Sequence, residues 1–428
     1  MIGESIMDTK GWDIVYVLSN AVTNNYLKKY IQENNTTFYY KDQNIEMELL
    51  FDSWELVPGG SNKILRFKTP VKKGKLIFNN KEESLDGICP LMEMQLDFIN
   101  DNNYITNLKF NLLVVGEKAG DTQDGAVTVI NPDLNNVITN PIILALLSAN
   151  LSKVFIENKE EISYIFAQLD LSPEDEWMKP KKYFYIYIAP TSSVNEGYLG
   201  ILSVVTNRDI SKLDNSIDTT MLDNNNDTFL LMSESLFLEN IIMPELPNRF
   251  GNGATINHFY LNKTSDTTGT IKNSKQLNCD TVRWGLIDYY PKWNDLEIKI
   301  QGDKLRTIAS GRCKIEGLAS SYINFSTEGA HQFYYNKNKT IIEFKNSSGF
   351  KVDTSLDIPW WIWLNPTVGA IAYGISAAIE KTVGNQLANN TSSYIGNLSG
   401  KVVKWSNQIT EINDCILNVG FCIKGSTK

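Results

Sequence analysis

Apolar and polar residues alternate along several stretches of this 428-residue chain, and this alternation constrains the fold more than any other feature. A period of two puts apolar side chains on one face of a strand. The sequence therefore predicts half-buried strands of mainly antiparallel sheets. The clearest run is residues 104–114, and further strands are expected at 45–51, 92–98, 162–169, 183–188, 198–205, 296–300, 340–344 and 402–423.

Apolar residues recur instead at spacings of three and four in four segments, which is the pattern of an amphipathic helix. The first predicted helix covers residues 13–32, with Asp13 as its N-cap and an apolar face made by Val15, Leu18, Val22, Tyr26 and Tyr30. Two more begin at Asn140-Pro141 and Asn365-Pro366, where asparagine caps the helix and proline takes the first helical position. A fourth is expected at 233–244.

The order of these segments predicts two halves, each with a helix, an antiparallel meander, an Asn-Pro helix and further strands. They span residues 1–210 and 231–428, with a polar linker or loop at 211–230, and no residue-level self-similarity relates them. A long helix beside a meander allows a curved sheet to wrap around it. The fold class is therefore α+β, without the nucleotide crevice of a parallel α/β sheet.

Composition excludes several kinds of function. The chain has 40 Lys+Arg against 49 Asp+Glu, a net charge of −9, which argues against a nucleic-acid partner. His258 and His331 are the only histidines, so neither a three-His metal site nor an HExxH motif is possible. Five scattered cysteines without a CxxC pair predict buried thiols rather than a disulfide framework or zinc module: Cys89, Cys279, Cys313, Cys415 and Cys422.

Catalytic and nucleotide-binding motifs are also missing from the sequence. It has no GxxxxGK loop and no complete GxGxxG run, and the nearest approach to a nucleophile elbow, residues 374–378, lacks the final glycine. We therefore expect a protein that is not an enzyme and needs no cofactor. A hydrolase whose site is assembled from residues distant in sequence stays open as a remote alternative.

Four segments resemble the OrfX family, whose genes lie in clostridial neurotoxin clusters. They are GWDIVY from Gly11, FDSWELVPGGSNKILRFKTPVKKGKL from Phe51, LLMSESLFLENIIMPEL from Leu230, and the helix after Asn365-Pro366. The resemblance implies an elongated TULIP (tubular lipid-binding, BPI-like) fold, with long helices wrapped by curved antiparallel sheets. It also implies a non-toxic accessory role without enzymatic activity, and it transfers no functional residue.

The most apolar stretch is residues 358–379, which carries no charge. Its length reaches that of a membrane span, but two prolines, Asn365 and two glycines interrupt it. It is either a span, a buried strand end leading into a helix, or an exposed tip that docks on lipid or a partner. Three tryptophans would suit a tip because indole joins an apolar body to one polar N–H: Trp360, Trp361 and Trp363.

A second candidate contact is the strand at 183–188, which is apolar on both faces. Its tyrosines either pack against a neighbouring part of the protein or line a ligand groove or partner surface: Tyr183, Tyr185 and Tyr187. Two lysine clusters are either solvated loops or contacts for anionic lipid headgroups. The clusters are Lys72, Lys73 and Lys75, and Lys179, Lys181 and Lys182.

The leading hypothesis is a non-enzymatic accessory protein that contacts lipid, membrane, sister OrfX proteins or the neurotoxin complex through apolar surface. The alternative is a purely structural scaffold whose groove is filled by its own side chains. The N-terminus has no basic segment followed by an apolar core and cleavage site, so no classical signal peptide is expected. We therefore expect synthesis in the bacterial cytoplasm and release together with the toxin.

Overall fold

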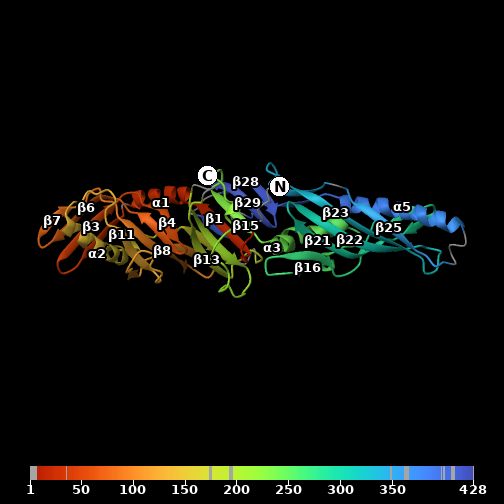
Figure 1. Ribbon diagram of the computed structural model, residues 1–428, viewed down its shortest axis with the longest axis horizontal. Helices are drawn as coiled ribbons and strands as arrows, with labels where there is room; N and C mark the ends of the chain where they lie inside the picture. The colour runs from red at the N-terminus through yellow and green to blue at the C-terminus, as the bar shows by residue number, and fades with distance from the viewer. Residues whose placement is uncertain are drawn as a thin grey trace. The chain divides into compact units, whose positions relative to one another are not determined.

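The computed structural model describes residues 7–34, 36–172, 176–191, 196–347, 349–360, 366–396, 398, 401–405 and 410–427 (Figure 1). The chain forms two compact units. Unit 1 contains Met1–Asp13, Leu231–Gly396 and Ile412–Ile423, and unit 2 contains Ile14–Leu230, Asn397–Glu411 and Lys424–Lys428. The sequence places a linker at 211–230. In the structure Ile217, Met221 and Leu222 of this segment are buried, so it packs as part of unit 2.

Unit 2 is built mainly from antiparallel strands. One sheet has the order β10-β11-β8-β9-β12-β27 with β4 and β5 joined to β8, and a second has the order β2-β3-β6-β7. A third group contains β13, β14 and β1. The strands are β1 (Ile14–Ser19), β2 (Thr37–Lys41), β3 (Ile45–Phe51), β4 (Glu55–Ser61), β5 (Ile64–Lys68), β6 (Val71–Phe78), β7 (Lys81–Ser84), β8 (Leu91–Asn100), β9 (Ile105–Asn111), β10 (Val114–Val115), β11 (Ala126–Asn131), β12 (Ala167–Asp170), β13 (Lys182–Ile188), β14 (Tyr198–Val204) and β27 (Val403–Trp405).

Two helices, α1 (Asn20–Asn34) and α2 (Pro141–Glu157), complete unit 2. The Asn-Pro prediction for α2 is confirmed, because the Asn140 side chain accepts a hydrogen bond from the Ile142 backbone N–H at 3.0 Å and Pro141 begins the helix. The prediction for residues 13–32 is wrong in its first part. Residues 14–19 form the fully buried strand β1, and Ser19 rather than Asp13 caps α1, accepting from the Val22 N–H at 3.3 Å.

The error has a physical reason. Ile14, Val15, Val17 and Leu18 with Tyr16 form a continuous run of β-branched, aromatic and aliphatic residues, which a strand buried on both faces requires. A short apolar run of this kind matches a helix face and a strand equally well by periodicity. The buried face of α1 is accordingly made by Val22, Thr23, Leu27 and Ile31 rather than by Tyr26 and Tyr30.

Unit 1 holds a larger antiparallel sheet of order β16-β17-β21-β22-β23-β24-β26, with β18 on β21 and β25 on β23. Its strands are β16 (Phe259–Lys263), β17 (Gly269–Asn273), β18 (Leu277–Asn278), β21 (Lys292–Gln301), β22 (Lys304–Lys314), β23 (Tyr322–Asn336), β24 (Ile341–Asn346), β25 (Lys351–Asp357) and β26 (Thr391–Tyr394). A small hairpin is formed by β19 (Val282–Trp284) and β20 (Ile287–Tyr289). The chain passes between the units within β15 (Thr228–Met232), β28 (Thr410–Asn418) and β29 (Gly420–Thr427).

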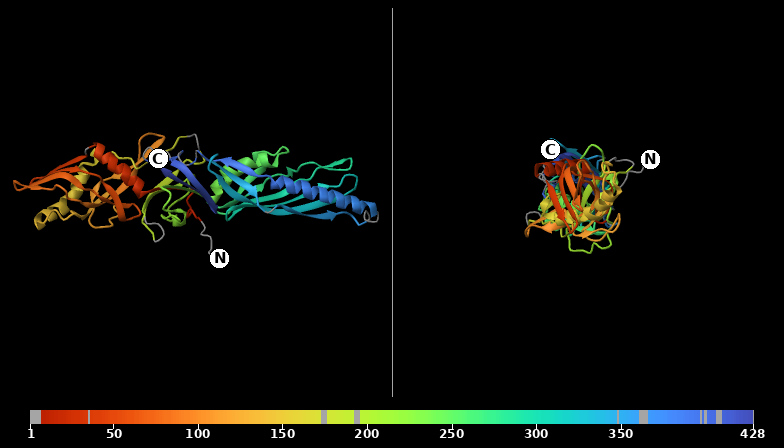
Figure 2. Two further views of the ribbon diagram at one scale, coloured as in Figure 1. Left: turned by 90° about the horizontal axis from the view of Figure 1, so that it is seen from above. Right: turned by 90° about the vertical axis from the view of Figure 1, so that its left-hand side faces the viewer.

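The helices of unit 1 are α3 (Glu234–Phe237), α4 (Leu246–Phe250) and the long α5 (Pro366–Ala388). A π turn and a 3-10 turn join α3 to α4, so the helix predicted at 233–244 is present in irregular form. Figures 1 and 2 show α5 lying along the strands of this unit. It packs through a stripe that faces the sheet: Ala372, Ile375, Ile379, Val383 and Leu387. Asn365, the predicted cap, lies outside the described residues.

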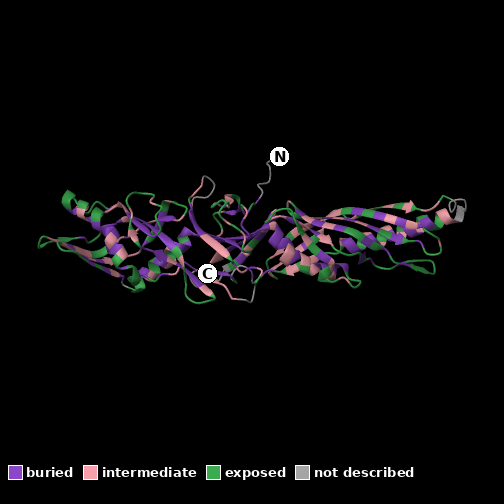
Figure 3. Ribbon diagram, turned by 90° about the horizontal axis from the view of Figure 1, so that it is seen from below, coloured by how far each residue is buried: buried purple, intermediate pink, exposed green. Residues whose placement is uncertain are grey.

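Each unit thus pairs helices with a strongly twisted antiparallel sheet, and Figure 3 shows the buried residues gathered inside each unit. This is the α+β class with mainly antiparallel strands that the sequence predicts. The β10–β11 pair is a parallel exception. In this architecture a ligand could bind between a helix and a sheet, or a partner could contact the outer surface.

Candidate functional site

The first predicted lysine cluster lies on β6. Lys73 and Lys75 are two residues apart and share a face of the strand, whereas Lys72 lies at an irregularity in the pairing with β3. On that face Lys75 Nζ lies 2.7 Å from the Glu48 carboxylate, which raises the pKa of Lys75 and lowers the pKa of Glu48. Tyr39 also donates to Glu48 at 3.0 Å. One of the three charges is therefore already neutralised.

The second cluster flanks β13. Lys181 is exposed, whereas Lys179 and Lys182 are half-buried. Lys182 Nζ donates to the Arg208 carbonyl oxygen at 2.5 Å, which uses part of its hydrogen-bonding capacity inside the protein. Contact of either cluster with lipid headgroups stays a prediction, and the geometry gives it no added support.

The tyrosines of β13 pack mainly within unit 2. Tyr185 is buried, its hydroxyl donates to the Lys63 carbonyl at 2.8 Å and accepts from the Leu96 N–H at 2.8 Å, and burial raises its pKa. Tyr187 is also buried. Tyr183 is half-buried against Phe98, with ring centroids 4.7 Å apart. The strand is covered by neighbouring strands, so it does not line a groove at Tyr185 or Tyr187.

Of the three candidate tryptophans, the structure places one. Trp360 is 73% exposed, and Trp361 and Trp363 lie outside the described residues. Trp360 therefore belongs to the surface rather than to the core. Contact of this segment with lipid or a partner stays a prediction.

A second exposed apolar element, which the sequence pattern did not predict, is the β19–β20 hairpin. The β19–β20 hairpin turns at Gly285, whose φ of +64° suits glycine, and the next residue, Leu286, is 93% exposed. Leucine at the apex of a turn is unusual, because turns favour Gly, Asn, Asp and Ser. We use the name apolar tip for the exposed large side chains of this region: Trp284, Leu286, Ile287, Tyr290, Trp360, Ile371 and Tyr373.

Strand register brings these residues to one end of the large sheet. Lys292 at the start of β21 lies opposite Arg312, and Tyr322 lies between Lys314 and Asp357 in neighbouring strands. The hairpin precedes β21 directly, and Trp360 follows β25 by three residues, so both extend from this end. On the hairpin side, Trp284 lies so close to Gly374 of α5 that a Cβ atom there would overlap its indole.

Charges around the apolar tip are balanced in pairs. Arg283 lies 4.0 Å from Asp288, Arg312 lies 3.5 Å from Asp357, and Lys314 lies 3.7 Å from Glu316. All of these side chains are substantially exposed and contribute little to stability. The region therefore offers apolar area beside charges that are mostly paired, with Lys292 as a further exposed cation at the start of β21.

The interior of unit 2, between α2 and the sheet, is filled by aromatic rings. Phe155 of α2 packs against Phe38, Phe51 and Trp54 at centroid distances of 5.3, 5.6 and 5.3 Å. Trp54 continues to Phe110 at 5.7 Å, and Phe110 to Phe166 at 5.0 Å. The side chains of the protein itself occupy this part of the seam where the resemblance would place an acyl chain.

In unit 1 the buried stripe of α5 is apolar, but polar side chains line one side of the helix. A hollow of about 570 Å³ lies between α5 and β25. Ser376 donates to Thr354 at 2.6 Å, and Thr354 donates to Glu380 at 2.6 Å. A chain of hydroxyls ending in a carboxylate does not suit a hydrocarbon tail, because burying polar groups against one would leave them poorly solvated.

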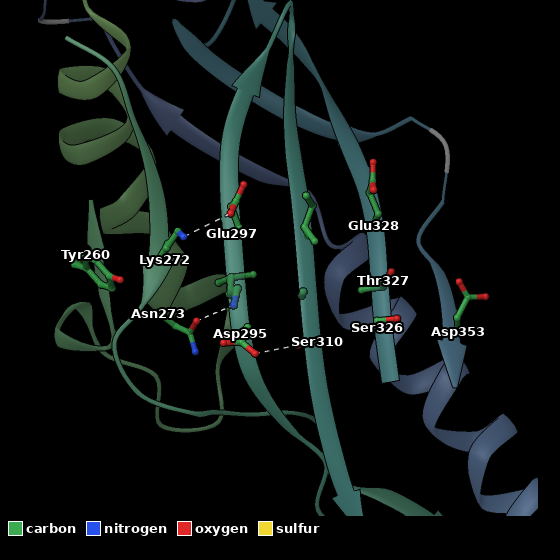
Figure 4. Close-up of a pocket in the computed structure, with 13 residues that line it drawn as sticks. Tyr260, Lys272, Asn273, Asp295, Glu297, Ser310, Ser326, Thr327, Glu328 and Asp353 are labelled. Atoms are coloured by element: carbon green, nitrogen blue, oxygen red, sulfur yellow. Dashed lines mark hydrogen bonds and ion pairs between the residues drawn. The ribbon is translucent and has the colours of Figure 1, made fainter. Parts of the chain in front are cut away.

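A further hollow of about 620 Å³ crosses the face of the large sheet from Tyr260 on β16 to Asp353 on β25 (Figure 4). Its acidic side chains are largely matched: Glu297 lies 3.7 Å from Lys272, and Glu328 lies 2.6 Å from Arg306. Asp295 accepts from Ser310 at 3.1 Å. This is a solvated sheet face rather than a place for an apolar ligand.

The two histidines lie in different surroundings. His258 Nδ1 accepts from the Thr255 N–H at 3.1 Å and so caps a turn, whereas His331 is buried beside Arg249. Within the described residues no group of His, Cys, Asp or Glu is placed to hold a metal ion. None of the helices in that part of the chain combines the length and apolarity needed to cross a bilayer. All five cysteines are buried thiols, as predicted.

A family model and two known proteins match most of the chain. The OrfX-like family model, described as Protein OrfX2/OrfX3/P47, matches residues 9–409. Protein P47 of Clostridium botulinum (strain Kyoto / Type A2) is 37% identical over 98% of this chain and 100% of its own length. Protein OrfX3 of the same strain is 22% identical over 77% of this chain and 74% of its own.

Solved structures agree with this result. The structure of P47 from C. botulinum A2 superposes with a TM-score of 0.85 at 35% identity, covering 98% of both chains. The crystal structure of P47 of C. botulinum E1 gives a TM-score of 0.85 at 34% identity, covering 99% of this chain and 100% of that one.

Proposed function

We propose, from the premise that this chain belongs to the OrfX-like family of OrfX2, OrfX3 and P47 proteins, that it is a non-enzymatic accessory protein of a neurotoxin cluster. In this proposal it acts by docking on a lipid membrane through the apolar tip of unit 1. The observation that carries the proposal is Leu286, a large aliphatic side chain 93% exposed at the apex of a hairpin.

The arrangement of side chains fits the depth profile of a bilayer. Leu286 and Ile287 stand at and beside the apex, where aliphatic groups would enter the hydrocarbon region. Four exposed aromatic residues in the same region carry polar atoms suited to the headgroup level: Trp284, Tyr290, Trp360 and Tyr373. A projecting hairpin suits a soft, deformable surface.

The apolar tip is expected to bind a membrane with moderate affinity, and this affinity should change little with salt concentration. Burying a Leu or Ile side chain contributes about 1.5–3 kcal/mol, so Leu286 and Ile287 together contribute about 3–6 kcal/mol before ordering costs, and the aromatic side chains add to this. Because the surrounding charges are paired, screening by salt removes little of this energy. Salt sensitivity would instead indicate the lysine clusters.

The second candidate is a structural scaffold that binds only sister OrfX proteins. The aromatic filling of unit 2 supports the part of this hypothesis that concerns a self-filled groove. It does not account for the exposed Leu286 unless a partner protein covers the same apolar tip. A hydrolase remains the least supported alternative. The Thr255 hydroxyl lies 2.8 Å from His258 Nδ1, but the two residues cap the same short turn, and His331 faces Arg249.

Flotation with phosphatidylcholine vesicles, with and without an anionic lipid, tests the proposal. Leu286→Asp is expected to weaken vesicle binding about 30- to 150-fold, because about 2–3 kcal/mol of apolar burial is lost. The melting temperature should stay unchanged, since the residue is exposed. Ile142→Asp in unit 2, also at an exposed residue, is the matched control and should bind as wild type.

Two outcomes would count against membrane docking. If the Leu286→Asp variant floats as well as wild type, the apolar tip does not contact lipid. If wild-type protein fails to bind vesicles of either composition but binds a purified sister OrfX protein, the scaffold alternative is the better account.

A further inference from the structure

Arg249 is a buried cation in unit 1 and is not part of the apolar tip. It lies on α4 and is only 7% exposed. One terminal nitrogen, Nη2, donates to the Leu387 carbonyl in the last turn of α5 at 2.8 Å. The same nitrogen lies 3.2 Å from both ring nitrogens of His331. Equal distances place it between the two nitrogens, off the in-plane direction of either lone pair.

The rest of the guanidinium is without a partner in the described part of the chain. Arg249 Nε and Nη1 are buried donors that make no hydrogen bond there. Gln386 Oε1 is also unpartnered, but as an acceptor it needs a donor such as water and does not itself point to an anion. Gln386 is close to this group, because its amide nitrogen donates to the carbonyl of Phe250, the residue after Arg249, at 2.8 Å. Buried polar groups without partners are rare, and an ion or ordered water often explains them.

The charge of the site is also uncompensated. Burial lowers the pKa of Arg249 to about 10, so the guanidinium is still protonated near neutral pH. Burial and the neighbouring cation lower the pKa of His331 to about 3, so the imidazole is neutral there. No carboxylate pairs with Arg249 among the described residues. The carboxyl end of α5 offers only about half a unit of negative charge.

We propose that Arg249 holds a small monovalent anion of halide type, such as chloride, inside unit 1. The anion accepts hydrogen bonds from the N–H groups of Nε or Nη1 and supplies the missing negative charge. A halide suits the site because the nearby side chains offer few other donors, whereas phosphate or sulfate would need several. Phe350, whose ring lies 5.2 Å from that of His331, adds an apolar wall that a weakly hydrated ion tolerates.

Crystals of the intact chain grown in sodium bromide give the first test. We expect an anomalous bromide peak within hydrogen-bonding distance of Arg249 Nε or Nη1. Water alone at this position, or bromide peaks only at surface residues, would overturn the proposal. This measurement needs no variant, so it stands even if a substitution at Arg249 prevents folding.

Thermal unfolding gives the second test. At equal ionic strength the melting temperature should be a few degrees higher in sodium chloride than in sodium gluconate, whose anion is too large to be enclosed. Arg249→Met should remove the difference between the two salts, and Arg283→Met, at an exposed arginine, should retain it. Equal melting temperatures of the wild type in both salts would contradict the proposal.

Discussion

Replacing Phe155 with alanine is expected to lower the free energy of unfolding of unit 2 by about 3–5 kcal/mol. Phe155 is fully buried and its ring contacts Phe38, Phe51 and Trp54. Its removal costs the transfer energy of the ring, the edge-to-face contacts and the cavity that remains. Urea unfolding monitored by tryptophan fluorescence, to which the neighbouring Trp54 contributes, measures the change.

Ile142→Ala provides the control on the same helix. Ile142 is exposed in the first turn of α2, so its substitution should change stability by no more than about 0.5 kcal/mol. If the Phe155→Ala variant were as stable as wild type, the ring would not be a packed part of the interior. The conclusion that unit 2 fills its own seam would then fail.

The second large effect concerns pH and His331. This imidazole has no exposed surface, and burial followed by the charge of Arg249 lowers its pKa to about 3, against about 6.5 when unfolded. Between these two pKa values the unfolded chain binds a proton on His331 and the folded chain does not. The contribution of His331 to the free energy of unfolding is fully present above pH 6.5. It falls by up to about 1.4 kcal/mol for each pH unit below that value, down to the folded-state pKa.

Comparison of wild type with His331→Gln isolates this contribution. Other groups titrate over the same range, notably Glu234, whose pKa burial raises to about 7 and whose effect has the opposite sign. The difference in melting temperature between the two proteins should therefore be followed from pH 7.5 to pH 4. Wild type should lose stability faster on acidification; parallel profiles would refute the assignment.

The sequence predicts the elements whose signals are local. Asn140 and Pro141 mark the start of α2, and the alternation at 104–114 becomes β9. The helix prediction is wrong at residues 14–19, because a short apolar run does not distinguish a strand buried on both faces from a helix face. Only the pairing of β1 with β14, a strand almost two hundred residues later, settles that choice.

The candidate site was only partly accessible from sequence. Trp360 lies on the surface as one hypothesis required, but the hairpin at 282–289 was overlooked. Its signal was present in Trp284-Gly285-Leu286-Ile287, a glycine turn flanked by large apolar residues where polar ones are usual. The neutralisation of Lys75 was not predictable, because Glu48 reaches it only through the β3–β6 register.

The central claim, that apolar contact is made by the apolar tip and not by the interior, is tested most directly with a fluorophore at residue 286. Leu286→Cys can be labelled selectively with an environment-sensitive dye, because all five native cysteines are buried. We predict a blue shift and brighter emission when phosphatidylcholine vesicles are added, and no response from the same dye at Ile142→Cys. A dye at position 286 that stays in water while the protein is bound to vesicles would contradict the account.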